Sequence, residues 1–373
     1  MFEKEKLTPA QTVVRMVCKI KKNERVLIIS NPSMGAIAQN LYTAILEEGA
    51  LPVLMYQPVK TLLDAATSEV LAAIKTEPDV IFSISEQKLG KDPEGIAKPY
   101  TCENGEKYDS AFDYLLSGKK SIRAIWTPGL TSNMFERTVC IDYRALAENC
   151  KKICAAYENA VSVKVTAPGG TDVTVPVAGR KGLSDNGDFS KPGSGGNIPA
   201  GEVFISPVVG NGKPESPSGT QGKIVFDGSM TFSDGESLLE TPISVDVVAG
   251  FVVSVEGGEE AKRLFKSITD AEKTAVQMEK NGKLPEGQGE VYKRNARNIG
   301  ELGIGLNPAA IISGNMLEDE KAFRTCHFAI GMNYDGDAPC LIHLDGVVRN
   351  PTIVFKYADG TEKIVLKNGD LQL

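Results

Sequence analysis

Histidine is almost absent from this sequence, because the 373 residues include only two. Long apolar runs are missing too, and none approaches the roughly 20 residues that a helix needs to cross a bilayer. The seven cysteines are irregularly spaced and contain no C-x-x-C pair, which fits free thiols in a reducing compartment. The start, MFEKEKLTPAQ, is charged where a signal peptide needs an apolar run, so we expect a cytoplasmic protein.

The charge and the missing nucleotide motifs exclude further classes of function. A formal net charge of -7 argues against nucleic acid or an anionic membrane as the main partner. Neither G-x-G-x-x-G nor G-x-x-x-x-G-K-[ST] occurs in the N-terminal portion, so we see no dinucleotide-binding or P-loop fingerprint there. We therefore expect a protein that binds neither nucleic acid nor a membrane.

Length and patterning predict two domains. Residues 1–160 alternate strand-like and helical segments, such as the apolar run at 24–30 and the helical patterns at 34–50 and 142–160. This alternation predicts an α/β domain with a mostly parallel sheet flanked by helices. Residues 161–373 are rich in strand and hairpin patterns and contain one long amphipathic helical pattern. They predict a β-rich α+β domain, which we expect to carry the metal ligands.

Both histidines lie in one short segment, CHFAIGMNYDGDAPCLIHLDGV. His343 and Asp345 are two residues apart in an apolar strand pattern, so their side chains point to one face of the strand. His327 begins another apolar run, and MNYDGDAP between the two runs is typical of a long hairpin loop. Paired antiparallel strands would bring both imidazoles to shared metal ions. Taken alone, however, His343 and Asp345 are more typical of an exposed polar pair.

Two glutamates stand in unusually apolar surroundings. Glu202 follows a Pro-Ala-Gly turn in NIPAGEVFISP, and Glu301 lies in the Gly-rich apolar stretch ARNIGELGIGLNP. A lone glutamate at a turn is usually solvated. Apolar neighbours favour burial instead, and a buried carboxylate needs a cation or a proton. Both glutamates are therefore candidate metal ligands.

Four motifs in this order, IPAGEVFISP, NIGELGIGLNP, CHFAIGMNY and IHLDG, resemble the aminopeptidase T family of metallopeptidases. The likeness lies in the C-terminal half, and the N-terminal half is similar only in its α/β texture. By this resemblance a pair of divalent ions (zinc, cobalt or manganese) would be held by five residues, Glu202, Glu301, His327, His343 and Asp345. It implies that Glu301 bridges the ions, that Glu202 and His327 complete one of them, and that His343 and Asp345 complete the other.

The resemblance also implies an activity, a dinuclear-metal aminopeptidase that removes N-terminal residues from peptides or amino-acid derivatives, and a homodimer. The two ions would generate hydroxide from one water near neutral pH. Tyr334, which matches the family's catalytic tyrosine, would donate a proton to the tetrahedral intermediate. Two departures stand out. The segment between Glu202 and Glu301 is longer than expected, and the loop between Tyr334 and His343, which walls the substrate cavity in the family, is shorter.

Two other interpretations remain open. His327, His343 and Asp345 alone would form the two-histidine, one-carboxylate face that binds a single Fe(II). Ring-opening dioxygenases that act on hydroxylated pyridines are similar in fold to the peptidase family, although the presence of both Glu202 and Glu301 favours two ions and hydrolysis. Alternatively, the α/β half is a binding or assembly module, and the metals are structural ions with a closed protein coordination.

Overall fold

The computed structural model describes residues 6–61 and 63–373, and the chain forms two compact units. The first unit comprises Met1–Ala147 and Asp185–Ala200, and the second comprises Glu148–Ser184 and Gly201–Leu373. The chain therefore passes between the units at three places, whereas the sequence placed one boundary at residue 160. Within the described ranges, no helix is both long and apolar enough to cross a membrane.

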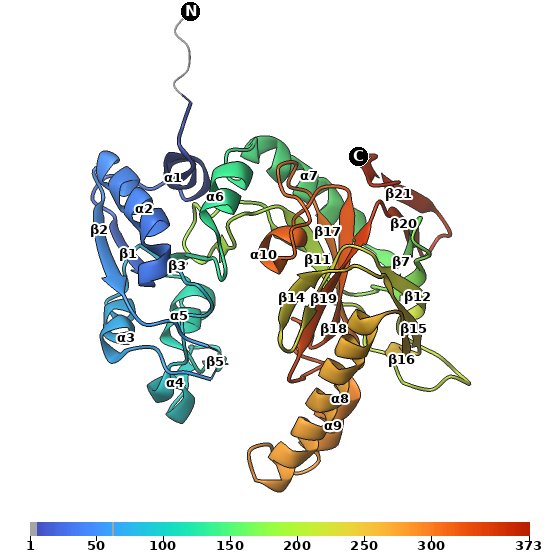
Figure 1. Ribbon diagram of the computed structural model, residues 1–373. Coiled ribbons are helices and arrows are strands. Elements are labelled where there is room, and N and C mark those ends of the chain that lie inside the picture. The colour runs from blue at the N-terminus through green and yellow to red at the C-terminus, as the bar shows by residue number, and fades with distance from the viewer. Residues whose placement is uncertain (1–5, 62) are drawn as a thin grey trace, which may run out of the picture. The chain divides into compact units, whose positions relative to one another are not determined.

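The first unit is built on a five-stranded parallel sheet in the order β10-β6-β3-β1-β2. Figure 1 labels its strands β1, β2 and β3. The connection from β1 through α2 to β2 and the connection from β2 through α3 to β3 run in opposite directions across the sheet. Because such crossovers are right-handed, α2 and α3 lie on opposite faces of the sheet. The predicted α/β domain with a mostly parallel sheet is therefore confirmed. Its strands are β1 (Arg25–Ser30), β2 (Leu51–Tyr56), β3 (Val80–Ile84), β6 (Arg123–Trp126) and β10 (Gly195–Gly196), and a separate hairpin joins β4 (Tyr100–Thr101) to β5 (Lys107–Tyr108).

Short helices connect these strands. The core beside the sheet contains Leu27 and Ile29 of β1, Val70 and Ile74 of α3, and Ile81 of β3. The spacing of two within a strand and of four within a helix puts these side chains on one face of each element. The helical segments are α1 (Pro9–Thr12), α2 (Gly35–Glu47), α3 (Ser68–Lys75), α4 (Pro93–Ala97), α5 (Ala111–Asp113) and α6 (Ser132–Thr138), with a 3-10 turn at Pro32–Met34 and π-helical turns at Val13–Val17 and Tyr114–Gly118.

The second unit contains two large sheets. A seven-stranded sheet has the order β14-β13-β19-β18-β17-β11-β9, and an eight-stranded sheet has the order β16-β15-β12-β8-β7-β20-β21-β22. The first comprises β9 (Leu183–Asp185), β11 (Glu202–Ile205), β13 (Ser229–Phe232), β14 (Gly235–Leu238), β17 (Ile299–Gly305), β18 (Thr325–Gly331) and β19 (His343–Arg349). The second comprises β7 (Ala160–Thr166), β8 (Asp172–Pro176), β12 (Gln221–Phe226), β15 (Ile243–Val248), β16 (Phe251–Glu256), β20 (Thr352–Tyr357), β21 (Glu362–Lys367) and β22 (Asp370–Leu371).

One amphipathic helix dominates the helical part of this unit. This long helix is α8 (Glu259–Lys280) (Figure 1). Its apolar side chains Ala261, Leu264, Ile268 and Ala271 are buried at intervals of three and four residues, which places them on one face of the helix. The other helices are α7 (Tyr143–Tyr157), which crosses the border between the units, α9 (Gln288–Asn295) and the short α10 (Met316–Asp319). The predicted β-rich α+β fold of the C-terminal region is confirmed.

The two faces of β19 serve different purposes. Gly346 approaches the ring of Phe226 from β12 so closely that a Cβ atom at 346 would lie 2.4 Å from it. Leu344 and Val348 flank Gly346 on the same face and are buried as well. This face therefore belongs to the apolar core, and the side chains at alternate positions, including His343 and Asp345, project from the other face.

Candidate metal centre

Neighbouring strands of the seven-stranded sheet supply all the predicted ligands. Gly303 lies opposite His327 in the β17–β18 pair, and Ala329 lies opposite Asp345 in the β18–β19 pair. Because opposite residues of antiparallel strands point to the same face, this register aligns the polar side chains. The predicted hairpin between the two histidine strands is thereby confirmed. One sheet face carries Glu202 from β11, Glu301 from β17, His327 from β18, and His343 and Asp345 from β19.

Small residues on this face make room for the polar side chains. A Cβ atom at Gly303 would come within 2.1 Å of Cε1 and Nε2 of His327, so the imidazole fills the space that a side chain would need. The register of β17 shifts between Ile299 and Glu301, and such a bulge re-aims the residue beside it. Gly303 of NIGELGIG is therefore required because the imidazole approaches the backbone of β17.

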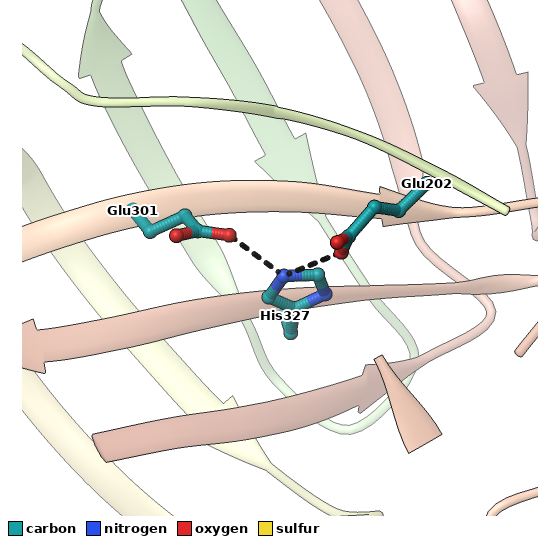
Figure 2. A group of neighbouring side chains, drawn as sticks. All are labelled: Glu202, Glu301 and His327. Carbon is teal, nitrogen blue, oxygen red and sulfur yellow. Dashed lines mark hydrogen bonds and ion pairs between the residues drawn. The ribbon is translucent and has the colours of Figure 1, made fainter. Parts of the chain in front are cut away.

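Glu301 lies between the two imidazoles. Its Oε1 is 3.0 Å from Nε2 of His327, and its Oε2 is 3.5 Å from Nε2 of His343. Oε2 of Glu202 approaches the same Nε2 atom of His327 at 3.5 Å, and Figure 2 shows both carboxylates turned toward that edge of the ring. Asp345 completes the group, with Oδ1 3.4 Å from Nε2 of His343. The structure thus brings together all five residues that the sequence singled out.

The backbone orients the second imidazole. Nδ1–H of His343 donates a hydrogen bond to the carbonyl oxygen of Met332 at 2.8 Å. This bond fixes the tautomer and leaves Nε2 as the atom that can bind a cation, as is usual for metal-binding histidines. His327 is fully buried, whereas the side chain of His343 is 16% exposed. Among the five predicted ligands, His343 therefore has the most accessible side chain.

Two further charged residues join the cluster, and the sequence did not single them out. Glu320 groups with His327 and Asp345 as a possible ligand set, and Lys321 forms ion pairs with both Glu202 and Glu320. They follow α10 in the run LEDEK, which is typical of a solvated surface. In the structure this run turns inward, because Glu318 accepts a hydrogen bond from the Ile311 N–H. Local sequence offers no signal that distinguishes these two arrangements.

Burial and neighbouring charge shift the pKa values of the cluster. Burial lowers the pKa of an imidazole, but the surrounding carboxylates outweigh it and raise the pKa to about 9 for His327 and about 10 for His343. Burial raises the pKa of Glu202 to about 8, against the opposing effect of Lys321. Burial raises the pKa of Asp345, but His343, His327 and Lys321 together outweigh it, so the pKa is lowered. In the protein without metal, protons therefore take the place of cations.

The donor atoms fit a divalent metal ion. Within the described part of the chain, no hydrogen-bond partner reaches Oε2 of Glu202, Oε2 of Glu301, Oδ1 of Asp345 or Nδ1 of His327, although all four atoms are buried. Buried carboxylate oxygens without donors are costly unless a cation meets them. Imidazole and carboxylate ligands together suit divalent zinc, iron, cobalt or manganese. The site is consistent with a divalent metal cofactor.

Tyr334 lies at the accessible edge of the cluster. Its ring centre is 5.1 Å from that of His343 and 5.7 Å from that of Phe204, and 57% of the residue is exposed. Its backbone N–H donates to Oγ of Ser206 at 3.2 Å. Arg180 holds the same loop through an ion pair of 2.6 Å with Asp335. The loop therefore presents the tyrosine beside the imidazole that is open to solvent.

Comparisons with known proteins point to two functional classes that share this fold. The family model of NicX, 2,5-dihydroxypyridine 5,6-dioxygenase, matches residues 132–371. The solved structure of 2,5-dihydroxypyridine dioxygenase from Pseudomonas putida KT2440 has 16% identity and a TM-score of 0.68, covering 97% of this chain and 96% of that chain. Wild-type AmpT from Thermus thermophilus has 17% identity and a TM-score of 0.62, covering 98% of both chains. No curated protein sequence matches significantly.

The expectation of a metal-dependent aminopeptidase, and of hydrolase or protease activity, is wrong. The dioxygenase family model covers all five predicted ligands and Tyr334. The resemblance to aminopeptidase T holds for the fold, which the AmpT structure and the dioxygenase structure both share with this chain. The four motifs specify strands and small residues that build one polar sheet face. They were therefore compatible with either chemistry, and the ligand roles of single residues stay predictions.

Proposed function

The chain belongs to the 2,5-dihydroxypyridine 5,6-dioxygenase family, and from this premise we propose that it is an Fe(II)-dependent dioxygenase that cleaves a hydroxylated pyridine ring. The observation that carries the proposal is the match over residues 132–371, because that range contains the whole polar cluster of the seven-stranded sheet. One Fe(II) takes the place of the two zinc, cobalt or manganese ions expected from sequence.

His327, His343 and Asp345 are the proposed ligands. They come from the paired strands β18 and β19 and offer two imidazoles and one carboxylate, a set that binds Fe(II) and leaves positions open for other molecules. Bound Fe(II) supplies the redox chemistry by which dioxygen reacts with an aromatic ring. Glu301 supports this set, because its carboxylate lies within 3.5 Å of Nε2 of His343 and closer to His327.

The surrounding residues orient the ligands and admit the substrate. The Met332 carbonyl holds His343 so that Nε2 faces the cluster. The substrate approaches beside His343, because His327 is fully buried on the other side. Tyr334 lies at this edge, and its phenol is protonated at neutral pH and can donate a hydrogen bond. We assign this hydrogen bond to an oxygen substituent of the pyridine ring. It replaces the proton donation to a tetrahedral intermediate that the resemblance to aminopeptidase T implied for Tyr334.

The reaction named by the family balances without an outside reductant. Both atoms of one dioxygen enter the product while the bond between ring atoms 5 and 6 breaks. A neutral, flat, hydroxylated ring suits an entry edge formed by the aromatic rings of Tyr334, Phe204 and His343. The substrate class follows from the family name, and the aromatic edge is consistent with it.

An oxygen-uptake assay tests the proposal. Protein freed of metal and reloaded anaerobically with Fe(II) should consume one dioxygen per 2,5-dihydroxypyridine and incorporate both atoms of isotopically labelled dioxygen into the product. The same protein loaded with Zn(II) should do neither, and amino-acid anilides should not be hydrolysed in either form. Full iron occupancy without oxygen uptake, across a panel of dihydroxypyridines, would contradict the assignment.

A further inference from the structure

Lys321 is a fully buried lysine at one end of the metal cluster. Its exposed fraction is 0%, and its ammonium group lies 2.7 Å from Oε1 of Glu202 and also contacts Oε1 of Glu320. The backbone fixes its position, because its N–H donates to the Glu318 carbonyl at 2.9 Å and its carbonyl accepts from the Asn307 N–H at 2.8 Å. A lysine in such a place is held there by charge, since an unpaired buried ammonium would be very costly.

The described residues form three possible ligand groups, and the lysine pairs with a member of two of them. The first group contains Glu202, which pairs with Lys321, together with Glu301 and His327. The second contains Glu320, which also pairs with Lys321, together with His327 and Asp345. The third contains Glu301, His343 and Asp345, and neither lysine partner belongs to it.

We propose that Lys321 is a built-in cation that restricts the centre to a single divalent ion at the end near His343 and Asp345. An ion held by Glu202 or Glu320 would share that carboxylate with an ammonium group. The two positive charges would repel each other strongly, because Lys321 and Glu202 are both buried. The ammonium also already occupies Oε1 of Glu202, one of the two oxygens that a second ion would use. Lys321 is a residue that determines metal stoichiometry, not a metal ligand.

This inference rests on the proposed function for the identity of the ion and for His327 as one of its ligands, since the third group itself contains Glu301, His343 and Asp345. It explains why the cluster contains both Glu202 and Glu301, which favoured two ions in the sequence analysis, and yet is proposed to hold one ion. One of these glutamates pairs with a lysine, and the other lies between the imidazoles. The number of carboxylates in the cluster therefore overstates the number of divalent ions that it holds.

Manganese stoichiometry tests the inference without any activity assay. We would dialyse metal-free wild-type protein and the Lys321→Met variant against saturating Mn(II), then measure manganese per chain by mass spectrometry and magnetic coupling by EPR. The wild type should bind one uncoupled ion. Lys321→Met should bind two ions with the spectrum of an exchange-coupled pair. Its thermal midpoint should rise more on addition of Mn(II) than that of the wild type, because the second ion replaces the lost charge.

Matched variants separate the charge from the side chain. Lys321→Met combined with Glu202→Gln should return to one ion, because a carboxylate is removed together with the ammonium. Lys266→Met removes an exposed lysine paired with Asp270 and should leave one ion.

Two ions in the wild type would overturn the inference. So would one ion in a folded Lys321→Met variant, or a variant that stays unfolded at saturating Mn(II). One ion without oxygen uptake would instead leave Lys321 its role and remove the dioxygenase assignment.

Discussion

At one end of the cluster, Glu202 and Glu320 share the ammonium group of Lys321, whereas at the other end Glu301 and Asp345 face imidazole nitrogens. The lysine end is therefore neutralised by the protein itself. At the histidine end, Oε2 of Glu301 and Oδ1 of Asp345 are buried without a hydrogen-bond partner in the described part of the chain. At the lysine end, Oε2 of Glu202 also lacks one, but Oε1 of the same carboxylate pairs with Lys321. The two ends use the same residue types for different purposes.

If Lys321 acts as proposed, one sheet face can be polar throughout and still present a single metal position. Buried carboxylates need compensation, and a lysine provides it permanently while a metal ion provides it reversibly. At the lysine end the side chain of Glu320 is 18% accessible, but it is paired with the fixed charge of Lys321. At the histidine end the side chain of His343 is 16% accessible, and the exposed ring of Tyr334 lies beside it. Chemistry should therefore be confined to the histidine end.

The largest expected effect comes from removing a metal-binding side chain at the histidine end. His343→Gln should weaken Fe(II) binding by more than about 100-fold, since losing a ligand costs more than losing the partner that orients one. Glu202→Gln should weaken it less than about tenfold, because Lys321 keeps Glu320 as a partner. Competition with a fluorescent chelator measures both affinities. Equal losses in the two variants would show that the ends are not distinct.

The affinity of the protein for metal should depend strongly on pH. Both imidazoles must lose a proton to bind metal, and their pKa values of about 9 and about 10 mean that metal displaces protons at neutral pH. Manganese affinity should therefore rise between about tenfold and about 100-fold per pH unit from pH 6.5 to 8.5. Isothermal titration in buffers of different ionisation enthalpy should detect the released protons, and a flat profile would contradict proton displacement.

The stability of the metal-free protein should change in the opposite direction. The folded-state pKa values of both histidines exceed their ordinary value of 6.5. Their stabilising contribution is complete below pH 6.5 and is lost as the pH rises through about 9 and 10. Glu202, raised from 4.5 to about 8, acts in the same direction at lower pH. The thermal midpoint without metal should therefore fall from pH 6.5 to 9, and a manganese-saturated sample should show no such fall.

Paired glycine variants should separate metal binding from folding. Gly303→Ala should displace His327, because the added Cβ would lie 2.1 Å from its ring, and should cost about 1–3 kcal/mol of stability along with metal affinity. Gly346→Ala introduces a similar clash on the opposite face, against Phe226 at 2.4 Å. It should cost similar stability and leave manganese affinity unchanged. Chemical denaturation and metal titration of both variants check this contrast, and loss of affinity in both would contradict it.

The ligand strands could be predicted because their signals are local. His343 and Asp345 share a face through the period of two in a strand, and the hairpin to His327 follows from two apolar runs around a polar loop. Glu202 and Glu301 stood out because they are acidic residues in apolar surroundings. Parallel-sheet architecture was equally visible in the first unit, where strand and helix patterns alternate.

The remaining features depend on contacts that are distant in sequence. The acidic run before Lys321 is buried because two contacts hold it: the Ile311 N–H donates to Glu318, and the Met316 N–H donates to Glu236 of β14. The Gly-rich segment at 184–197 has the composition of a loop, yet β10 within it joins the parallel sheet. Gly195 makes this possible, because a Cβ atom there would lie 2.4 Å from the Ala124 carbonyl. The substrate class was misassigned because the four sequence motifs encode the polar sheet face, and this face is compatible with either chemistry.

The smallest effect is expected from the hydroxyl group of Tyr334, and it should again be confined to the histidine end. Tyr334→Phe keeps the ring beside His343 and Phe204, so iron content should be unchanged. Loss of one hydrogen bond to the substrate should lower kcat/KM by about threefold to tenfold, which corresponds to about 0.5–1.5 kcal/mol. Tyr334→Ala, which also removes the ring, should have a larger effect on KM. Unchanged kcat/KM in Tyr334→Phe, measured by oxygen uptake with dihydroxypyridine, would leave the phenol without a role and assign substrate orientation to the aromatic surface alone.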